Sequence, residues 1–533
     1  MKKTGLHLLF TTLAVLLLCC ALCLFAAAEE RTITLDVQNG QDISAAFNKA
    51  ADAVRYNDGD THLTIVIPAG TYKSGTNLRL YSHTTVQMDG ATIVHTDSAS
   101  TMLRLGRRAA DWEEANDGTG HPGYSGFCDI TLEGGTWNGG GKQQAIMRFG
   151  HSTDITLRGV TFCNVKNAHM VELGGCKDVL IEGCTFSSFR GNWDSATNYE
   201  ALQLEIVSTQ GSHFGGYNPD NDETPCENIT VTGCTFKNLQ RGVGTHSGIA
   251  GSFFSNISIT DNTFVNITGF AVIATNYADS TVSRNRISRC GAGILMRTVE
   301  LSHNNFYRSA VFHEKQTDYP LLGCTIADNR ISITPGYRAQ FSTFTYGIQL
   351  TGELLKKRAG STPAGDYRIA DVRVSGNVIK LNGAGYAVWL NGAAENRVEK
   401  NQITVTVQGE HNTAGILLQK STANRLLNNQ IRFKYKTEYS DVCGVMLQDQ
   451  SEENLVYKNN ISAARKDGIF LRESNGCVIR ANTVSASGRD GIHLEQSSAL
   501  TILSNSVKGS GRNGIFSNGI TNSKYQKNSI SRA

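Results

Sequence analysis

Acidic residues in the stretch from 145 to 300 have the types and spacing for glycoside cleavage. That reaction needs one carboxylic acid to protonate the leaving group and one carboxylate to act as nucleophile or base. Glu172 and Glu205 are the pair that we predict for these roles. Glu200 and Gln203 are predicted to bind the sugar beside them. A solvated, charged surface is the alternative interpretation of the same residues.

Histidine and arginine residues in the same stretch would also permit elimination. In a polysaccharide lyase, a base removes a proton next to a uronate carboxylate while cationic groups hold that carboxylate. His246 is the candidate base, and Arg148 and Arg297 are the candidate clamp. His169 is a further predicted binding residue. For His246, ordinary packing on a strand is the competing interpretation. In the hydrolase reading, His246 instead positions the sugar.

Long loops on either side of Glu205 carry aromatic and polar residues that suit a sugar. Aromatic rings stack on sugar faces, and polar groups fix hydroxyls. We predict that Trp193, His213 and Tyr217 bind substrate in this way. Loops longer than their neighbours beside a binding surface often carry function.

We expect no cofactor and no metal ligands. Asp220, Asp222 and Glu223 can bind Ca²⁺ through carboxylate oxygens. A plain acidic loop is the preferred interpretation of these three residues.

A repeating architecture would bring these residues, which are far apart in sequence, together. An apolar-x-x-Asn-x-apolar pattern recurs, and its spacing is 23 residues from Asn459 onward. With period-two alternation of apolar residues, such a repeat predicts a solenoid of short strands. We expect each asparagine to adopt the left-handed conformation at a bend and to hydrogen-bond to the next coil. The pattern includes Asn262, Asn285, Asn329, Asn377, Asn401, Asn429, Asn459, Asn482, Asn505 and Asn528.

A second strand pattern, Gly-Ile-x-Leu-x, recurs once per coil and positions the candidate residues. Its Ile and Leu point inward and each x points outward. Aligning these strands puts Glu172 and Glu205 on neighbouring coils, one outward position apart. With ~4.8 Å between strands and ~6.8 Å along a strand, their Cα atoms should lie roughly 8 Å apart. Both retaining and inverting geometries remain open.

The outward positions of the later coils are apolar. Trp389, Leu417, Met446 and Phe470 occupy successive coils of the same strand pattern. We expect this 389–470 face to be covered either by a loop or by a partner, and side-by-side oligomers could form through it.

The N-terminal residues predict export and a cap. Residues 1–28 have the basic start, apolar run and small-residue end of a signal peptide. Residues 29–533 then form a single domain, with the cap and first coils in 29–110 and inserted loops in 187–227 and 334–369. Asp42 to Tyr56 is an amphipathic helix that would close the open end of the solenoid.

Composition excludes several other classes. Removing Lys2 and Lys3 leaves 48 basic against 47 acidic residues. The sequence has no basic stripe, so we expect no nucleic-acid binding. The sequence has no second long apolar segment, so we expect no membrane association after signal removal. Ten of the 13 cysteines remain after signal removal and show no zinc-type spacing, so we expect mostly free core thiols, with one disulfide left open.

The N-terminal segments resemble a known superfamily. The capping helix, the Ile-Pro-Ala-Gly-Thr-Tyr segment ending at Tyr72 and the Asp-Gly-Ala-Thr-Ile segment ending at Ile93 are together similar to the start of pectin-lyase-like proteins. This resemblance implies an all-β, single-stranded right-handed parallel β-helix solenoid of about fifteen coils with an N-terminal capping helix. It also implies a carbohydrate-active protein whose site lies on the long first sheet. The reactive motifs of its polygalacturonase-like members are absent, apart from a loosely similar Gly-Thr-His-Ser-Gly at 244–248.

We therefore expect a secreted or cell-surface enzyme that cleaves a polysaccharide or oligosaccharide, by hydrolysis rather than elimination. A lyase for uronate-containing glycans and a non-catalytic glycan-binding surface protein are the alternatives. The expected partner is a glycan.

Overall fold

The structure is a computed structural model of the protein. It describes residues 28–55, 59–106, 122–191, 193, 199–207, 222–245, 247–298, 306–308, 319–334, 345–355 and 365–531. The predicted signal peptide, except for Ala28, lies outside the described residues.

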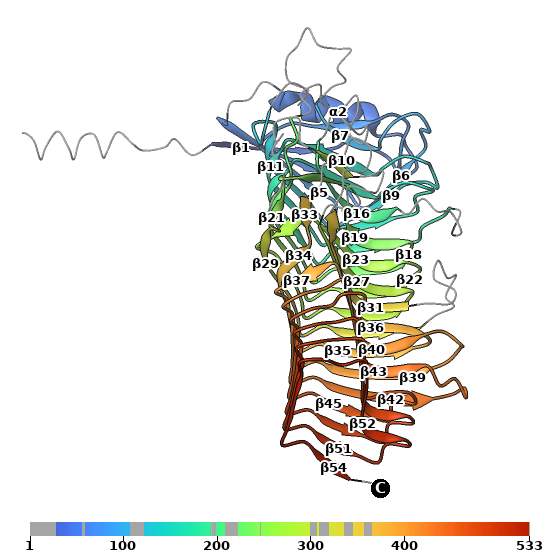
Figure 1. Ribbon diagram of the computed structural model, residues 1–533. Helices are drawn as coiled ribbons and strands as arrows, with labels where there is room; N and C mark the ends of the chain where they lie inside the picture. The colour runs from blue at the N-terminus through green and yellow to red at the C-terminus, as the bar shows by residue number, and fades with distance from the viewer. Residues whose placement is uncertain are drawn as a thin grey trace, which may run out of the picture.

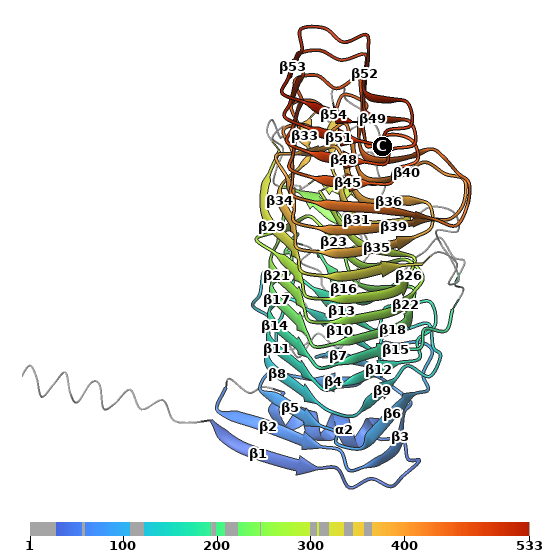
Figure 2. The ribbon, with the colours of Figure 1, turned by 90° about the horizontal axis from the view of Figure 1, so that it is seen from below.

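Three long parallel sheets wind into a right-handed β-helix, and each coil passes through the third, second and first sheet in turn. In Figures 1 and 2 the coils stack from α2 at the N-terminal end to β54 at the C-terminal end. Among the described residues the first sheet has 15 strands, which agrees with the fifteen coils expected.

The strands of the first sheet are β4 (Leu78–Leu80), β7 (Leu103–Leu105), β10 (Met147–Gly150), β13 (Val171–Gly174), β16 (Glu200–Glu205), β19 (Arg241–Gly244), β23 (Phe270–Thr275), β27 (Ala292–Arg297), β31 (Thr345–Thr351), β36 (Gly385–Asn391), β40 (Thr413–Gln419), β43 (Val442–Gln448), β46 (Ile469–Arg472), β49 (Asp490–Glu495) and β52 (Asn513–Asn518). Those of the second sheet are β3 (Gly70–Ser74), β6 (Ala91–His95), β9 (Thr136–Asn138), β12 (Thr161–Cys163), β15 (Thr185–Ser187), β18 (Thr235–Leu239), β22 (Thr263–Ile267), β26 (Arg286–Cys290), β30 (Arg330–Ile333), β35 (Val378–Asn382), β39 (Gln402–Val407), β42 (Gln430–Tyr435), β45 (Asn460–Ser462), β48 (Thr483–Ser485), β51 (Ser506–Lys508) and β54 (Ser529–Ser531). Those of the third sheet are β1 (Glu29–Thr34), β2 (Thr61–Val66), β5 (Thr84–Gln87), β8 (Cys128–Glu133), β11 (Thr153–Arg158), β14 (Lys177–Glu182), β17 (Glu227–Thr232), β21 (Phe254–Thr260), β24 (Tyr277–Ala278), β25 (Thr281–Ser283), β29 (Leu321–Ala327), β34 (Ile369–Ser375), β37 (Ala393–Ala394), β38 (Arg397–Glu399), β41 (Arg425–Leu427), β44 (Leu455–Tyr457), β47 (Val478–Arg480), β50 (Thr501–Leu503) and β53 (Lys524–Gln526).

The core runs along the axis of the coils and consists of the inward residues of all three sheets. Ile and Leu of the Gly-Ile-x-Leu-x strands are fully buried, as at Ile469 and Leu471. Equivalent aromatic residues of successive coils stack on one another, with ring centroids 4.7 Å apart for Phe186 and Phe236. The ten described cysteines are all free thiols, as expected, and most are buried.

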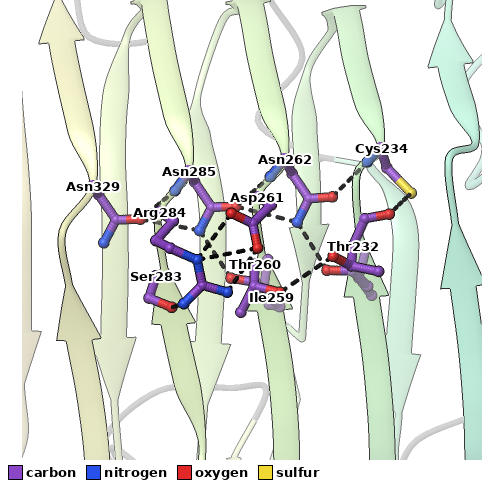
Figure 3. Close-up of polar contacts among 11 residues, drawn as sticks. Thr232, Cys234, Ile259, Thr260, Asp261, Asn262, Ser283, Arg284, Asn285 and Asn329 are labelled. Atoms are coloured by element: carbon purple, nitrogen blue, oxygen red, sulfur yellow. Dashed lines mark hydrogen bonds and ion pairs between the residues drawn. The ribbon is translucent and has the colours of Figure 1, made fainter.

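The recurring asparagines form a hydrogen-bonded ladder at the corner between the third and second sheets. Asn285 Nδ2 donates to Asn329 Oδ1 at 3.0 Å and to the carbonyl of Ile259 at 2.8 Å. Asn262 donates to Asn285 in the same way, as Figure 3 shows. The ladder is continuous to Asn528. The expected coil-to-coil hydrogen bonding is confirmed.

The left-handed bend lies one residue earlier than expected. Asp261, Arg284 and Asp328, which precede ladder asparagines, have φ values of 59°, 55° and 56°. No described ladder asparagine has a positive φ. The prediction that asparagine itself makes the bend was therefore wrong. Its side chain must stay in the corner to bond both neighbouring coils, so the preceding residue takes the left-handed conformation.

A short helix caps the N-terminal end of the coils (Figure 1). The helix α2 covers Ser44–Ala51 and continues as the 3₁₀ turn η1 (Asp52–Val54), within the predicted range. Ile43, Phe47 and Ala50 are buried. The helix thus closes the open end of the core, as expected of a solenoid cap. No helix among the described residues has the length and apolarity to span a bilayer.

Each predicted insertion range includes a strand of the first sheet, and the second also includes a hairpin outside the three sheets. The range 187–227 contains β16, and the range 334–369 contains β31 and the antiparallel hairpin of β32 (Glu353–Leu355) and β33 (Gly365–Tyr367). A short parallel pair, β20 (Gly248–Ala250) and β28 (Phe306–Arg308), lies outside the three sheets.

Candidate functional site

The first sheet places the candidate carboxylates in the predicted register. Glu172 pairs with Arg148 on one side and with Gln203 on the other. Glu205 pairs with Gly174, two residues along β13 from Glu172. The alternation of the strand points all of these polar side chains away from the core.

These outward positions are nevertheless buried. The exposed fraction is 6% for Glu172 and zero for Glu205, and Gln203 and Glu200 are buried as well. The alternative interpretation, a solvated charged surface, therefore does not hold at these positions. Buried polar groups require hydrogen-bond or ionic partners, because desolvation without compensation costs several kcal/mol.

Glu172 and Glu205 both have such partners. Arg148 Nε donates to the carboxylate of Glu172. Gln203 Nε2 donates to Glu205 Oε2 at 2.7 Å, and the backbone N–H of Ile206 donates to Glu205 Oε1 at 3.0 Å. Each carboxylate thus has a hydrogen-bond donor in contact, which compensates for its desolvation.

Glu200 is the centre of a second ionic group. Arg241 Nη1 donates to Glu200 Oε1 at 2.6 Å. His169 Nδ1 lies 2.8 Å from the Glu200 carbonyl oxygen and 3.6 Å from its Oε2. His169 also packs edge-on against Tyr199. The structure thus brings the buried side chains of His169, Glu172, Glu200, Gln203 and Glu205 together with the half-buried Arg148 as one polar layer.

The predicted arginine clamp is not assembled. Arg148 lies on β10 and Arg297 on β27, five strand positions along the first sheet. At ~4.8 Å per strand this is roughly 24 Å, beyond the reach of two guanidinium groups toward one carboxylate. Arg297 Nε instead donates to Thr275 Oγ1 at 3.0 Å. The pairing of Arg148 with Arg297 was therefore wrong.

The loop residues give a mixed result. Trp193 packs edge-on against Phe189, with ring centroids 5.2 Å apart, and against the core. His213, Tyr217 and the candidate base His246 lie outside the described residues.

The acidic loop is tied to the coils through Asp222. Its carboxylate accepts hydrogen bonds from the N–H of Gly123 at 2.6 Å and from the hydroxyl of Thr224 at 2.6 Å. Burial disfavours the charged form, but these hydrogen bonds outweigh it and hold the pKa of Asp222 below its usual value. This carboxylate therefore joins the described end of the loop at Asp222 and Thr224 to the segment at Gly123. Asp220, the second candidate ligand for Ca²⁺, lies outside the described residues.

The apolar 389–470 face is covered within one chain. Leu417, Met446 and Phe470 are buried and form one cluster. Trp389 is partly buried and stacks on Tyr346 at a centroid distance of 5.3 Å. The cluster is thus largely buried in the single chain, and the side-by-side oligomer through this face stays an untested prediction.

A polar groove of about 670 Å³ lies at the corner between the first and third sheets. Its volume falls in the range of small-molecule and oligosaccharide-sized sites, about 300–1,000 Å³. The hairpin β32–β33 borders it, and the turns after β36, β40, β43 and β46 line it. The lining residues are Thr351, Gly352, Glu353, Leu354, Arg368, Asn391, Gly392, Lys420, Thr422, Asp449, Gln450, Glu452 and Glu473.

Carboxylates dominate the charged groups of this groove. Asp449 Oδ2 accepts a hydrogen bond from Gln419 Nε2 at 2.9 Å, and Glu452 Oε1 accepts one from Asn475 at 3.1 Å. Glu353 Oε2 is shielded from solvent and accepts no hydrogen bond from the described residues.

The cations of the groove are fewer. Arg368 binds Asp366 through Nε and Nη2, at 3.0 Å and 2.7 Å, and is thereby neutralised. Lys420 is exposed.

Sequence reasoning missed this groove because its residues are turn residues. Lys420, Asp449 and Glu473 follow directly after the Gly-Ile-x-Leu-x strands and have φ values of 48°, 57° and 50°. Extending the alignment of the strands by one residue would have placed all three in one column. No local sequence pattern indicates that these turns lie beside the hairpin.

A third polar cluster lies on the C-terminal coils of the first sheet. His493 Nδ1 lies 2.8 Å from Asp490 Oδ2, and His493 Nε2 lies 2.7 Å from Glu495 Oε1. The ring stacks between Phe470 and Phe516. Asp467, Asp490 and His493 have the spacing of metal ligands, but Arg489 already pairs with both aspartates.

Comparisons with known proteins agree on the architecture. The family model described as "Right handed beta helix region" matches residues 223–431 and 364–532. Plasmin and fibronectin-binding protein A of Streptococcus pneumoniae is 25% identical over 276 residues, which is 46% of this chain and 37% of that protein. The chain thus matches little more than a third of the length of this curated relative.

Solved structures are similar to the coils at low identity. The surface adhesin PfbA of Streptococcus pneumoniae matches with a TM-score of 0.55 and 19% identity, over 77% of this chain and 91% of that one. An exopolygalacturonase from Thermotoga maritima matches with a TM-score of 0.43 and 11% identity, over 76% and 91% of the two chains. At these identities the likeness concerns the fold alone.

Proposed function

The chain belongs to the right-handed β-helix family, and we propose that it binds glycans outside the cell, without cleaving them, in the groove beside the hairpin β32–β33. The groove is the observation that carries this proposal. Its volume suits an oligosaccharide, and hydroxyl, amide and charged groups line it on consecutive coils. Such groups match a ligand that presents many hydroxyls.

Burial of the predicted acid pair favours binding over cleavage. A general acid and a nucleophile must approach the glycosidic oxygen and the sugar ring to within hydrogen-bond distance. Glu205 has no exposed surface, and Glu172 is held by Arg148. A glycan would have to displace the residues that cover both carboxylates.

A location outside the cell is supported by the predicted signal peptide and by the relatives. The similar Streptococcus pneumoniae protein is named for binding plasmin and fibronectin, and the structure of PfbA is described as that of a surface adhesin. We propose a secreted or surface-attached location for this chain on those grounds.

Glycoside hydrolysis by Glu172 and Glu205 is the second candidate function. Their position on neighbouring strands of the first sheet favours it, because two carboxylates must flank the scissile bond. In that case Gln203 and Arg148 would hold the substrate, and loop residues would have to move to admit it.

One screen separates binding from cleavage. The purified protein is offered a glycan library, and bound glycan, new reducing ends and the ultraviolet absorbance of unsaturated uronates are measured together. We expect binding without either product. New reducing ends that disappear in Glu172→Gln and Glu205→Gln would establish hydrolysis and overturn the proposal.

Groove variants localise the binding. Asn391→Ala and Thr422→Ala remove polar groups from the groove, and each should weaken glycan binding by a few-fold to about tenfold. Ser462→Ala, on β45 of the second sheet, is the control. Unchanged affinity in both groove variants would place the glycan elsewhere.

A further inference from the structure

We infer that the groove selects glycans that carry free, protonated amino groups. This inference rests on the proposed glycan binding and specifies the class of glycan. It follows from the charge of the groove and from the hydrogen-bonding state of its carboxylates.

The charge balance of the groove is negative. Four carboxylates line it, those of Glu353, Asp449, Glu452 and Glu473. Among the described lining residues the cations are Arg368 and Lys420, and Asp366 neutralises Arg368. With the Arg368–Asp366 pair neutral, the four carboxylates and Lys420 leave the described lining residues with about three negative charges. A cationic ligand is electrostatically complementary to them.

The carboxylates are spaced along the stack of coils. Asp449 follows β43 and Glu473 follows β46, so they lie at equivalent turns of neighbouring coils, ~4.8 Å apart. Glu452 lies three residues beyond Asp449 in the same turn region. A chain of sugars laid across successive coils would thus meet acceptors repeatedly.

The acceptors retain capacity for a donor. Glu473 is exposed and makes no side-chain hydrogen bond to the described residues. The side-chain hydrogen bonds that Asp449 makes to described residues involve only its Oδ2. Glu353 Oε2 is shielded from water and lacks a donor among the described residues. A shielded oxygen is out of reach of a ligand, so Glu353 contributes negative charge alone. An ammonium group would instead form charge-assisted hydrogen bonds with the exposed Glu473 and with Oδ1 of Asp449.

The same charges discriminate against other glycans. A uronate or a sulfated sugar would bring like charge to the groove, which costs binding free energy. A neutral N-acetylated sugar would gain the hydroxyl contacts but not the ionic ones. The arrangement therefore favours amino sugars over both classes.

Matched oligosaccharides test the inference. A β-1,4-linked glucosamine oligomer and its fully N-acetylated counterpart share length and linkage and differ only in the amino groups. Titration calorimetry with the whole protein should show that the amine form binds on the order of tenfold tighter or more, as one charge-assisted hydrogen bond provides. Added salt should reduce this difference.

Charge variants of the groove should move the affinity in opposite directions. Glu473→Gln and Glu452→Gln should each weaken binding of the amine form severalfold, and Lys420→Gln should strengthen it. Glu410→Gln, at an exposed carboxylate outside the groove, is the matched control. Thermal melting of each variant checks that the fold is retained.

The outcomes separate this inference from the proposed function. Equal binding of both oligomers, or tighter binding of the acetylated one, overturns the inference and leaves glycan binding intact. Binding of oligolysine without binding of any glycan overturns both, because the groove would then be a peptide site. No response to the Glu473, Glu452 and Lys420 substitutions overturns the assignment of the amine to this groove.

Discussion

At the scale of single residues, each ladder asparagine in the middle of the stack hydrogen-bonds to the coils on both sides of it. Asn459 Nδ2 donates to Asn482 Oδ1 at 3.1 Å and to the Leu426 carbonyl at 2.9 Å, while its Oδ1 accepts from Asn429. Because the corner is buried, each of these groups would lose its partner without regaining water. Asn460, the next residue, is exposed.

We predict that Asn459→Ala lowers the free energy of unfolding by about 1–3 kcal/mol, because it strands buried donors and acceptors of two coils. Chemical denaturation followed by circular dichroism measures the change. Asn460→Ala serves as the control and should change stability by less than about 0.5 kcal/mol. Equal effects of the two substitutions would contradict a structural role for the ladder.

The cluster around His493 predicts a pH dependence at acid pH. Burial disfavours the charged form of Asp490, but hydrogen bonds from His493 and Asn513 outweigh it and hold the pKa of Asp490 below its usual value. A carboxyl whose pKa is lowered on folding adds stability above its unfolded pKa of about 3.9, and this stability is lost as the pH falls through the folded value.

We therefore expect Asp490→Asn to be less stable than the wild type at about pH 6 and to lose less stability on going to about pH 3. Denaturation midpoints measured across that range test this. Glu410→Gln should follow the wild type. Parallel pH profiles of the wild type and Asp490→Asn would show that Asp490 is not the group that responds.

At the scale of elements, the cap α2 stabilises the end of the core at which the stack begins. Phe47 is fully buried there, whereas Lys49 on the same helix is exposed. We predict that Phe47→Ala costs about 3–5 kcal/mol, the usual range for a buried phenylalanine. Denaturation and limited proteolysis near the N-terminus are the measurements. Lys49→Ala should have little effect, and comparable losses in both variants would argue against a sealing role.

Strands and turns differed in how far they could be predicted. Apolar alternation is a local property, so the pairing of Arg148, Glu172 and Gln203 followed from the sequence. The burial of Glu205 did not, because it depends on what lies over the sheet. The groove was not predicted for the same reason. The hairpin β32–β33 and the turns that line the groove are far apart in sequence and come together only in the folded chain. The clamp of Arg148 and Arg297 was proposed because both side chains are cationic. The number of strands between them, which fixes their distance, was not taken into account.

At the scale of the whole molecule, the covered 389–470 face predicts a monomer. Leu417, Met446 and Phe470 are buried in the single chain, so association through them would gain little. Light scattering of the purified protein should give the mass of one chain, and small-angle scattering should give a rod whose fifteen first-sheet strands span roughly 70 Å at ~4.8 Å per strand. A threefold mass would contradict this. Leu417→Asp would then be tested for dissociation.

The identical 23-residue spacing of Asn459, Asn482, Asn505 and Asn528 has a consequence for how such a molecule changes over generations. Each unit presents the same upper and lower surface, so duplication or deletion of one gene segment would lengthen or shorten the molecule by a fixed step without requiring a new interior. The length of the molecule could thus change without altering ligand binding in the groove, because the groove lies largely N-terminal to these interchangeable units.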